Sequence, residues 1–360
     1  MASALKNLVG RDFIRDVARA LETQDRKFDA RAFIRDCDGG DWDRLELKAR
    51  TRRVATQLGH HVPGAFPAQL GKILKVAGNF SGLAALTFPE YVEQFGLKFP
   101  ELSLPALKEL TVYSTSEFGI RPFLREDLSG TLKVMKTWAR DPDERVRRLA
   151  SEGCRPRLPW SFPLKDLMRD PAPVLPILER LKDDESLFVR KSVANHLNDI
   201  SKDHPELVLR LAKEWIGQSA RTDWILKHAL RTLLKKGDQR ALKLFGVAVA
   251  KNVEVRDLKF TAKAFRIGGR VEFSFALVNE ARSEQNLRLE YAIHYVKKTK
   301  GPSKKVFKIS ERPFAPGPHA LKRSHSLRQM TTREHLPGRH ELEVIVNGVT
   351  LARGSFQIKN

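Results

Sequence analysis

The first two-thirds of the chain carries apolar residues at the spacing of helices. Phe13, Val17 and Leu21 recur every four residues, and a similar stripe begins at Leu132 and ends at Trp138. Side chains at this spacing lie on one face of a helix, and that face is then buried. Short breaks rich in Asp, Pro or Gly separate the stripes. Residues 1–250 are therefore predicted to form a series of short helices.

One helical segment recurs along this part of the chain. Val146–Ala150 aligns with Val189–Val193 at an offset of 43 residues, and a weaker third copy begins at Ile225. Each copy follows an Asp-rich or short polar loop. A period near 40 is typical of HEAT-type helix pairs, which bury a continuous core only when they are stacked. The repeat predicts an α-helical solenoid.

Near residue 250 the hydrophobic period changes from 3.6 to 2. Apolar and polar residues alternate in 271–277 and 287–295, and a third alternating run, 342–346, leads into the hairpin signal Asn347-Gly348. About seven short strands in residues 251–360 predict an immunoglobulin-like β-sandwich. The expected fold is multidomain, α then β: a HEAT-like α-helical repeat solenoid in 1–250, followed by the sandwich in 251–360.

The charge of the chain points to a nucleic-acid partner. Lys and Arg number 65 against 43 Asp and Glu, and the net charge is +22. Residues 251–360 alone hold 22 basic and 10 acidic residues. A basic folded chain gains affinity from each phosphate that it neutralises. Solubility, or attraction to acidic membranes and ribosomes, is the alternative use of such charge.

Several classes of protein are excluded by the same sequence. The two cysteines lie far apart, which excludes a disulfide framework and a Cys-rich zinc module. No uninterrupted apolar stretch of about 18 residues is present, so we expect no membrane span. No P-loop, dinucleotide fingerprint, metal-spaced His/Cys cluster or nucleophile elbow occurs, and we expect neither metal nor cofactor. Cys154 is interpreted as a small buried hydrophobic residue, and His196 as a solvent-facing or packing residue rather than a ligand. The chain is expected in the cytoplasm, at the nucleoid when bound to DNA.

Three carboxylates stand out against the basic background. When the 43-residue offset is removed, Asp199 falls four residues beyond Glu152, which is one helical turn. The two acids should therefore project from similar faces of neighbouring helices. Glu117 precedes Glu152 by 35 residues, close to one repeat length. Acids on such a face oppose phosphate binding unless they act on a cation; ordinary solvated or arginine-paired acids are the alternative.

The segment after Glu152 fixes one aromatic side chain. Pro156 and Pro159 stop the helix and stiffen the chain on either side of Leu158, just before Trp160. A tryptophan held in this way offers its ring to a cation or a sugar, or it anchors the core. Both interpretations remain open at this point.

Three long runs carry a family resemblance. SEFGIRPFL (116–124), RRLASEGCRPRLPW (147–160) and FVRKSVANHLNDISKDHP (188–205) resemble the DNA alkylation-repair glycosylases of the AlkC and AlkD superfamily. The run Glu-Gly-x-Arg-Pro-x-Leu-Pro-Trp and the trailing sandwich are similar to the AlkC branch in its form with an immunoglobulin-like domain. The resemblance covers nearly the whole chain.

The resemblance implies a monofunctional DNA glycosylase. Its expected substrate is double-stranded DNA that carries cationic alkylated bases, 3-methyladenine and 3-methylcytosine. It would hydrolyse the N-glycosidic bond without base flipping and act as a monomer. The carboxylates Glu117, Glu152 and Asp199 would then surround the scissile nucleotide, stabilise the oxocarbenium-like sugar and position a water. Trp160 would pack against the sugar, and which acid orients the water stays open.

Basic residues near these acids are the expected contacts to DNA phosphates. Arg147 and Arg190 are instead expected to brace the loop Asp of each repeat. The segment 297–305 is predicted to be a basic loop that reaches DNA, with a solvated hairpin end as the alternative. The predicted DNA-binding residues are Arg121, Arg155, Arg157, Lys191, Lys202, Lys300 and Lys304. A non-catalytic HEAT-repeat scaffold that binds nucleic acid is the rival function.

Overall fold

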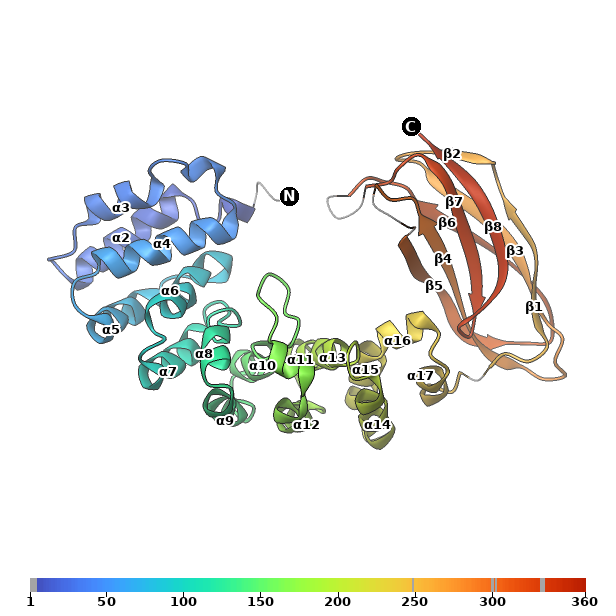
Figure 1. Cartoon of the computed structure of the whole chain (residues 1–360), viewed down its shortest axis with the longest axis horizontal. Helices are drawn as coiled ribbons and strands as arrows, with labels where there is room; N and C mark the ends of the chain where they lie inside the picture. Colours follow the sequence, from blue (N-terminus) through green and yellow to red (C-terminus); the bar gives the residue numbers. More distant parts are fainter. Residues whose placement is uncertain (1–4, 248, 299–300, 302, 331–333) are drawn as a thin grey trace. The chain divides into compact units, whose positions relative to one another are not determined.

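The computed structural model describes residues 5–247, 249–298, 301, 303–330 and 334–360. Helices fill the described chain up to Leu244, and strands follow from Val253 (Figure 1), as the change of period predicts. The α-helices are α2 (Arg11–Gln24), α3 (Ala30–Asp38), α4 (Leu47–His61), α5 (Phe66–Ala77), α6 (Thr87–Phe95), α7 (Pro100–Leu110), α8 (Arg121–Glu126), α9 (Leu128–Trp138), α10 (Glu144–Glu152), α11 (Lys165–Arg169), α12 (Leu175–Leu181), α13 (Leu187–Ile200), α14 (Pro205–Trp215), α15 (Ala220–Ala229), α16 (Arg231–Lys236) and α17 (Gln239–Leu244). Short 3₁₀ turns are η1 (Trp42–Arg44), η2 (Gly82–Leu86) and η3 (Ala172–Val174).

The chain divides into two compact units. One comprises Met1–His204 with Gly217–Ala229, and the other comprises Pro205–Ile216 with Leu230–Asn360. The second unit therefore contains α14, α16 and α17 as well as the strands. Within the part of the chain that is described, no helix is long and apolar enough to cross a bilayer.

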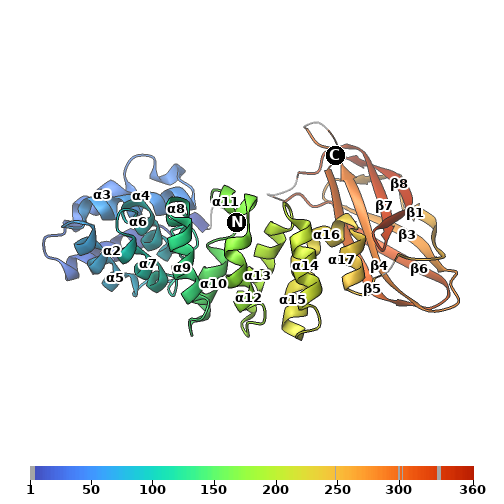
Figure 2. The same cartoon turned by 60° about the horizontal axis from the view of Figure 1, so that its bottom comes forward.

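The predicted repeat is confirmed in the first unit. The aligned segments lie on α10 and α13, which pack against each other, and α13 packs in turn against α15 (Figures 1 and 2). Helices α9 and α12 pack together and against α10, and they form the second layer of this stack. The apolar residues of the repeat, Val146 and Val189 among them, are buried between these layers. The helix of the third copy, α15, ends at Ala229. A turn at Leu230 separates it from α16, which begins at Arg231.

Capping side chains set where the repeat helices begin. Asp143 accepts a hydrogen bond from the backbone N–H of Arg145 at the start of α10, and Ser186 accepts one from Phe188 at the start of α13. Each cap satisfies a backbone donor that the helix leaves unpaired. The Asp-rich loops found in the sequence thus act as helix starts.

The strands form a two-sheet sandwich with the order β1-β3-β6 in one sheet and β2-β8-β7-β4-β5 in the other. The described residues contain eight strands, one more than expected. Alternate residues of β3 are buried between the sheets, which confirms the predicted period of 2. In β4 every residue from 287 to 293 is buried, and the alternate apolar ones belong to the core between the sheets. The strands are β1 (Val253–Phe260), β2 (Ala264–Arg266), β3 (Arg270–Asn279), β4 (Gln285–Tyr295), β5 (Ser303–Phe314), β6 (Gly317–Ser326), β7 (Gly338–Val346) and β8 (Val349–Lys359).

The turn between β7 and β8 follows the sequence signal. Asn347 and Gly348 both have positive φ, 48° and 81°, as a two-residue type I′ hairpin requires. The basic loop is shorter than predicted, because Lys304 and Lys305 already belong to β5. Lys300 lies outside the described residues.

Candidate functional site

The three predicted acids are brought together by a row of alternating charges. We call this the charge row: Glu117, Arg148, Glu152, Arg155, Asp199 and Lys202, in that order along it. Neighbours in the row lie within 4 Å, so each acid contacts at least one base and each internal base joins two acids. The predicted proximity of Glu152 and Asp199 is therefore found in the structure.

Arg155 joins the two buried acids of the row. Its Nη1 lies 2.6 Å from Glu152 Oε1, and its Nη2 lies 2.9 Å from Asp199 Oδ2. Glu152 is 5% exposed, Asp199 2% and Arg155 7%. Charges this far from water require partners, since desolvation of an unpaired ion costs several kcal/mol. Burial lowers the pKa of Arg155, but the carboxylates of Glu152 and Asp199 outweigh it and raise that pKa above its ordinary value.

Arg148 was missed by the sequence reasoning. Its Nη1 lies 2.7 Å from Glu117 Oε2 and its Nη2 lies 3.6 Å from Glu152 Oε1. The guanidinium also lies 4.6 Å from the ring centroid of Phe188 at the start of α13. The spacing of Arg148 four residues before Glu152 on one helix was the signal that could have identified it.

Two carboxylate oxygens remain outside the hydrogen bonds of the row. In Glu117, Oε2 is the oxygen that contacts Thr115 and Arg148. In Glu152, Oε1 is the oxygen that contacts Arg148 and Arg155. Among the described residues, nothing donates to Glu117 Oε1 or Glu152 Oε2. Asp199 differs, because Arg155 occupies its Oδ2 and Lys202 its Oδ1. The two glutamates therefore each keep one oxygen available to a water or a cationic group.

Arg121 does not contact the surface, and its predicted role as a phosphate ligand is wrong. Its side chain is fully buried and donates to the carbonyls of Gly153, Arg155 and Phe162 at 2.5–3.0 Å. Burial lowers the pKa of this guanidinium to about 10. Arg121 therefore holds the segment after α10 from inside the protein.

The role of Arg155 is corrected for the same reason. A guanidinium that is almost fully buried between two carboxylates has no surface to offer a phosphate. The charge of Arg155 can be read from the sequence. Whether the loop turns its side chain into the protein or toward the surface cannot. Arg155 links the acids.

The loop from α10 to α11 projects from the helical layer (Figure 1), and it carries Trp160. Gly153 lets this loop leave the helix, because a Cβ there would lie 2.6 Å from Ile120 Cγ2. Trp160 is 63% exposed, which excludes the core-anchor interpretation. Its φ of 64° is left-handed, a conformation that costs a non-glycine residue free energy and is concentrated at functional sites.

The remaining predicted phosphate contacts lie at different depths. Lys191 is exposed on α13, and the side chain of Lys202 is 41% exposed beside Asp199. Arg157 is partly exposed and paired with both oxygens of Asp203. In the sandwich, Lys304 is paired with Glu343 at 2.6 Å.

The repeat arginines brace their loops, as expected. Arg147 donates to both carboxylate oxygens of Asp184 at 2.7 and 3.1 Å. Arg190 donates instead to the backbone carbonyls of Asp184 and Glu185. Both arginines thus fix the loop before α13.

The predicted burial of Cys154 is confirmed, and of the two alternatives for His196 the structure shows the packing one. Both side chains are fully buried. Burial raises the pKa of the Cys154 thiol to about 12, so it is not a nucleophile at neutral pH. Burial lowers the pKa of His196 to about 3, and this neutral ring bonds the carbonyl of Ser151 at 2.9 Å.

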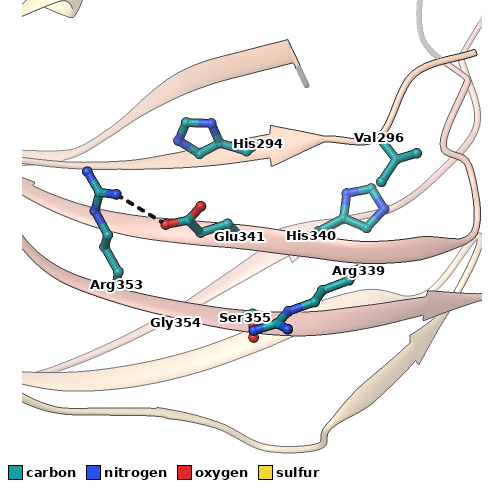
Figure 3. A pocket seen from close by; sticks show the side chains of 8 residues that line it. All are labelled: His294, Val296, Arg339, His340, Glu341, Arg353, Gly354 and Ser355. Carbon is teal, nitrogen blue, oxygen red and sulfur yellow. Dashed lines mark ion pairs between the residues drawn. The ribbon is translucent and has the colours of Figure 1, made fainter. Parts of the chain in front are cut away.

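A separate cavity of about 510 Å³ lies over β4, β7 and β8 of the sandwich (Figure 3). Among the residues that line it, Arg353 pairs with Glu341 at 3.6 Å (Figure 3). Arg353 and His294 also lie 3.3 Å and 3.2 Å from Glu343, and Arg339 is exposed. No group of His, Cys, Asp and Glu suited to a metal ion occurs in the described part of the chain. None of the predicted acids lies here.

Comparison with known proteins places these features in a family. Residues 109–233, which contain the charge row, match the family of the DNA alkylation repair enzyme, and residues 254–360 match the C-terminal Ig-like domain of the uncharacterised protein YhaZ. The uncharacterized protein YhaZ of Bacillus subtilis (strain 168) is 43% identical over 98% of this chain and 99% of its own length.

A solved structure is similar over the whole chain. It is the Pseudomonas fluorescens alkylpurine DNA glycosylase AlkC bound to DNA containing an abasic site analog. The two chains share 40% identity, each is covered to 99%, and the TM-score is 0.95. The chain therefore belongs to the AlkC family of DNA alkylation repair proteins, in the form that carries a C-terminal Ig-like domain.

Proposed function

We propose that this protein is a DNA glycosylase that removes cationic alkylated bases from duplex DNA. The observation that carries the proposal is the charge row, where three carboxylates lie together in a chain of net charge +22. The similarity to the alkylpurine DNA glycosylase AlkC, which was solved on DNA, supports the same function. The proposed substrates are 3-methyladenine and 3-methylcytosine.

The chemistry of these bases fits the carboxylates. A base methylated at N3 already carries a positive charge, so its glycosidic bond breaks without protonation of the leaving group. The enzyme then has to stabilise the positive charge that grows on the deoxyribose and to hold a water for attack. Fixed carboxylates with little water around them do both, because their charge is oriented before the reaction begins.

The contacts within the row support a role for each of its acids. We propose that Glu152 and Asp199 stabilise the sugar cation, with Glu117 as a close neighbour. The open oxygens, Glu152 Oε2 and Glu117 Oε1, are the atoms available to a water. Arg148 contacts both glutamates and Arg155 contacts Glu152, so that these oxygens need no reorganisation during the reaction.

Trp160 completes the proposed site. We propose that its exposed ring packs against the deoxyribose beside the acids, while the base stays in the duplex without base flipping. Exposed Lys191 and Lys202, with Arg157, would hold the flanking phosphates. In this proposal residues 1–250 carry catalysis and residues 251–360 provide further contacts to DNA.

Base release from methylated duplex DNA tests the proposal. The purified chain should release 3-methyladenine and leave abasic sites, and borohydride should trap no covalent complex, since hydrolysis uses water as the nucleophile. Binding without release would reject the glycosylase and favour the rival, a non-catalytic scaffold. Trapping by borohydride would overturn the monofunctional mechanism.

A further inference from the structure

The loop that carries Trp160 is held by a residue from a distant part of the chain. Lys48, in the first turn of α4, donates from its Nζ to the backbone carbonyl of Trp160 at 2.7 Å. The two residues are 112 positions apart in the sequence. A hydrogen bond from an ammonium group is among the stronger kinds that proteins use.

The same ammonium also contacts the residue beside Glu117. Lys48 Nζ lies 4.4 Å from the ring centroid of Phe118, within the range of a cation–π interaction. It thus joins the Trp160 tip to the segment that carries one end of the charge row. The carboxylates of Glu90 and Glu93 on α6 also interact electrostatically with Lys48. Among the described residues, the ammonium of Lys48 thus directly contacts the carbonyl of Trp160 and the ring of Phe118.

Backbone hydrogen bonds from Ser161 to Leu158 and from Leu164 to Pro156 close the loop around its tip, but neither involves Trp160 itself. Trp160 has a left-handed backbone, and its ring is mostly in solvent, so packing of the ring does not hold it. Arg121 binds the carbonyls of Gly153, Arg155 and Phe162, which lie on either side of the tip. At Trp160 itself, the described residues supply one donor to the carbonyl, and that donor is Lys48.

We propose that Lys48 is a positioning residue for Trp160. Its ammonium fixes the backbone of the tip, and with it the direction in which the indole ring leaves the loop. This inference rests on the proposed function, in which the ring meets the sugar beside the acids. It gives the first helical repeats a role in the reaction through α4, since α4 lies far outside the segment that carries the acids.

Two substitutions at this position separate positioning from other roles. Lys48→Met keeps the aliphatic stem and removes the donor, whereas Lys48→Arg retains a cation that donates to a carbonyl. Lys75→Met, at an exposed lysine of α5, is the matched control. Single-turnover release of 3-methyladenine should fall about 10-fold to 100-fold in Lys48→Met, as expected for a misplaced contact group. Lys48→Arg should restore most of the rate, and Lys75→Met should match the wild type.

A double variant tests whether Lys48 acts through the tryptophan. In a Trp160→Ala background, Lys48→Met should cause little further loss of rate. An equal loss in both backgrounds would overturn the proposal, because Lys48 would then act by itself, for example on a phosphate. A Lys48→Met variant that is as fast as the wild type would also overturn it.

The fluorescence of Trp160 tests the positioning role of Lys48 without a measurement of catalysis. Of the five tryptophans, Trp42, Trp138 and Trp215 are buried, so a Trp224→Phe background leaves Trp160 as the exposed emitter. Time-resolved anisotropy should show faster local motion of Trp160 in Lys48→Met than in Lys48→Arg. Unchanged anisotropy would overturn the positioning role. If the wild type releases no base, the proposed function fails, while the anisotropy still decides whether Lys48 positions Trp160.

Discussion

Glu152 and Asp199 belong to adjacent stacked repeats and bind the same guanidinium, that of Arg155. One nearly buried cation thus holds two nearly buried anions at a fixed separation. The arrangement orients both carboxylates without exposing them to water. It also makes the site depend on the packing of α10 against α13.

Replacement of Arg155 should destabilise the protein strongly. Arg155→Met leaves Glu152 and Asp199 without their common partner, and a broken buried pair costs about 3–5 kcal/mol. Urea denaturation measures this loss as a lower free energy of unfolding. Arg157→Met is the control, because its more exposed pair with Asp203 should contribute about 1 kcal/mol or less. Similar losses in the two variants would show that Arg155 is not the link described here.

Replacement of an exposed lysine near the charge row should change the salt dependence of DNA binding. If Lys191 neutralises one phosphate, Lys191→Ala should reduce the slope of log K against log salt by about 0.9. Binding should weaken by the same factor on damaged and undamaged duplexes, because a phosphate contact carries no base information. Lys136→Ala, at an exposed lysine of α9 in the other layer, should leave the slope unchanged. Equal slopes for Lys191→Ala and the wild type would remove Lys191 from the interface.

The stability of the protein should depend on pH through Glu93. Burial, with a contribution from the Glu90 carboxylate, raises the pKa of Glu93 from 4.5 to about 7. The folded state therefore binds this proton more tightly than the unfolded state does. The resulting stability is fully present below pH 4.5 and is lost as the pH rises through about 7.

Glu93→Gln, which is neutral at every pH, isolates this effect. The variant should be more stable than the wild type by up to about 3 kcal/mol above pH 7, and the difference should vanish near pH 4.5. Denaturation at pH 5 and pH 8 measures it, and Glu126→Gln, at an exposed glutamate of α8, should show no such trend. A gain that is equal at both pH values would contradict the titration of Glu93.

The architecture could be predicted from the sequence because it depends on period. Alternation in β3 and the 43-residue repeat both reflect which side chains face a core, and the structure buries those residues. The same register brought Glu152 and Asp199 to neighbouring helices. The hydrophobic period can be read within a single helix or strand. It can therefore be recognised before the tertiary contacts are known.

The roles of individual arginines could not be predicted in this way. Arg121 and Arg155 look like surface cations in the sequence, yet both are buried by the path of the loop after Glu152. Their partners are backbone carbonyls and carboxylates that are 3 to 44 residues away. The contact of Lys48 with Trp160 spans 112 residues and leaves no pattern in the sequence.

In the proposed mechanism the carboxylates of the charge row act on the sugar cation, and Glu152→Gln removes one of these charges. Glutamine keeps the shape of the side chain and one acceptor oxygen for Arg148 and Arg155 but removes the negative charge. Single-turnover release of 3-methyladenine from methylated duplex DNA is measured beside the Kd for the same DNA, below the melting temperature of the variant. Glu126→Gln is the control. Glu152→Gln should release the base at a rate at least about 100-fold lower, with an unchanged or tighter Kd. Release within a few-fold of the wild-type rate would show that the Glu152 carboxylate does not act on the sugar cation.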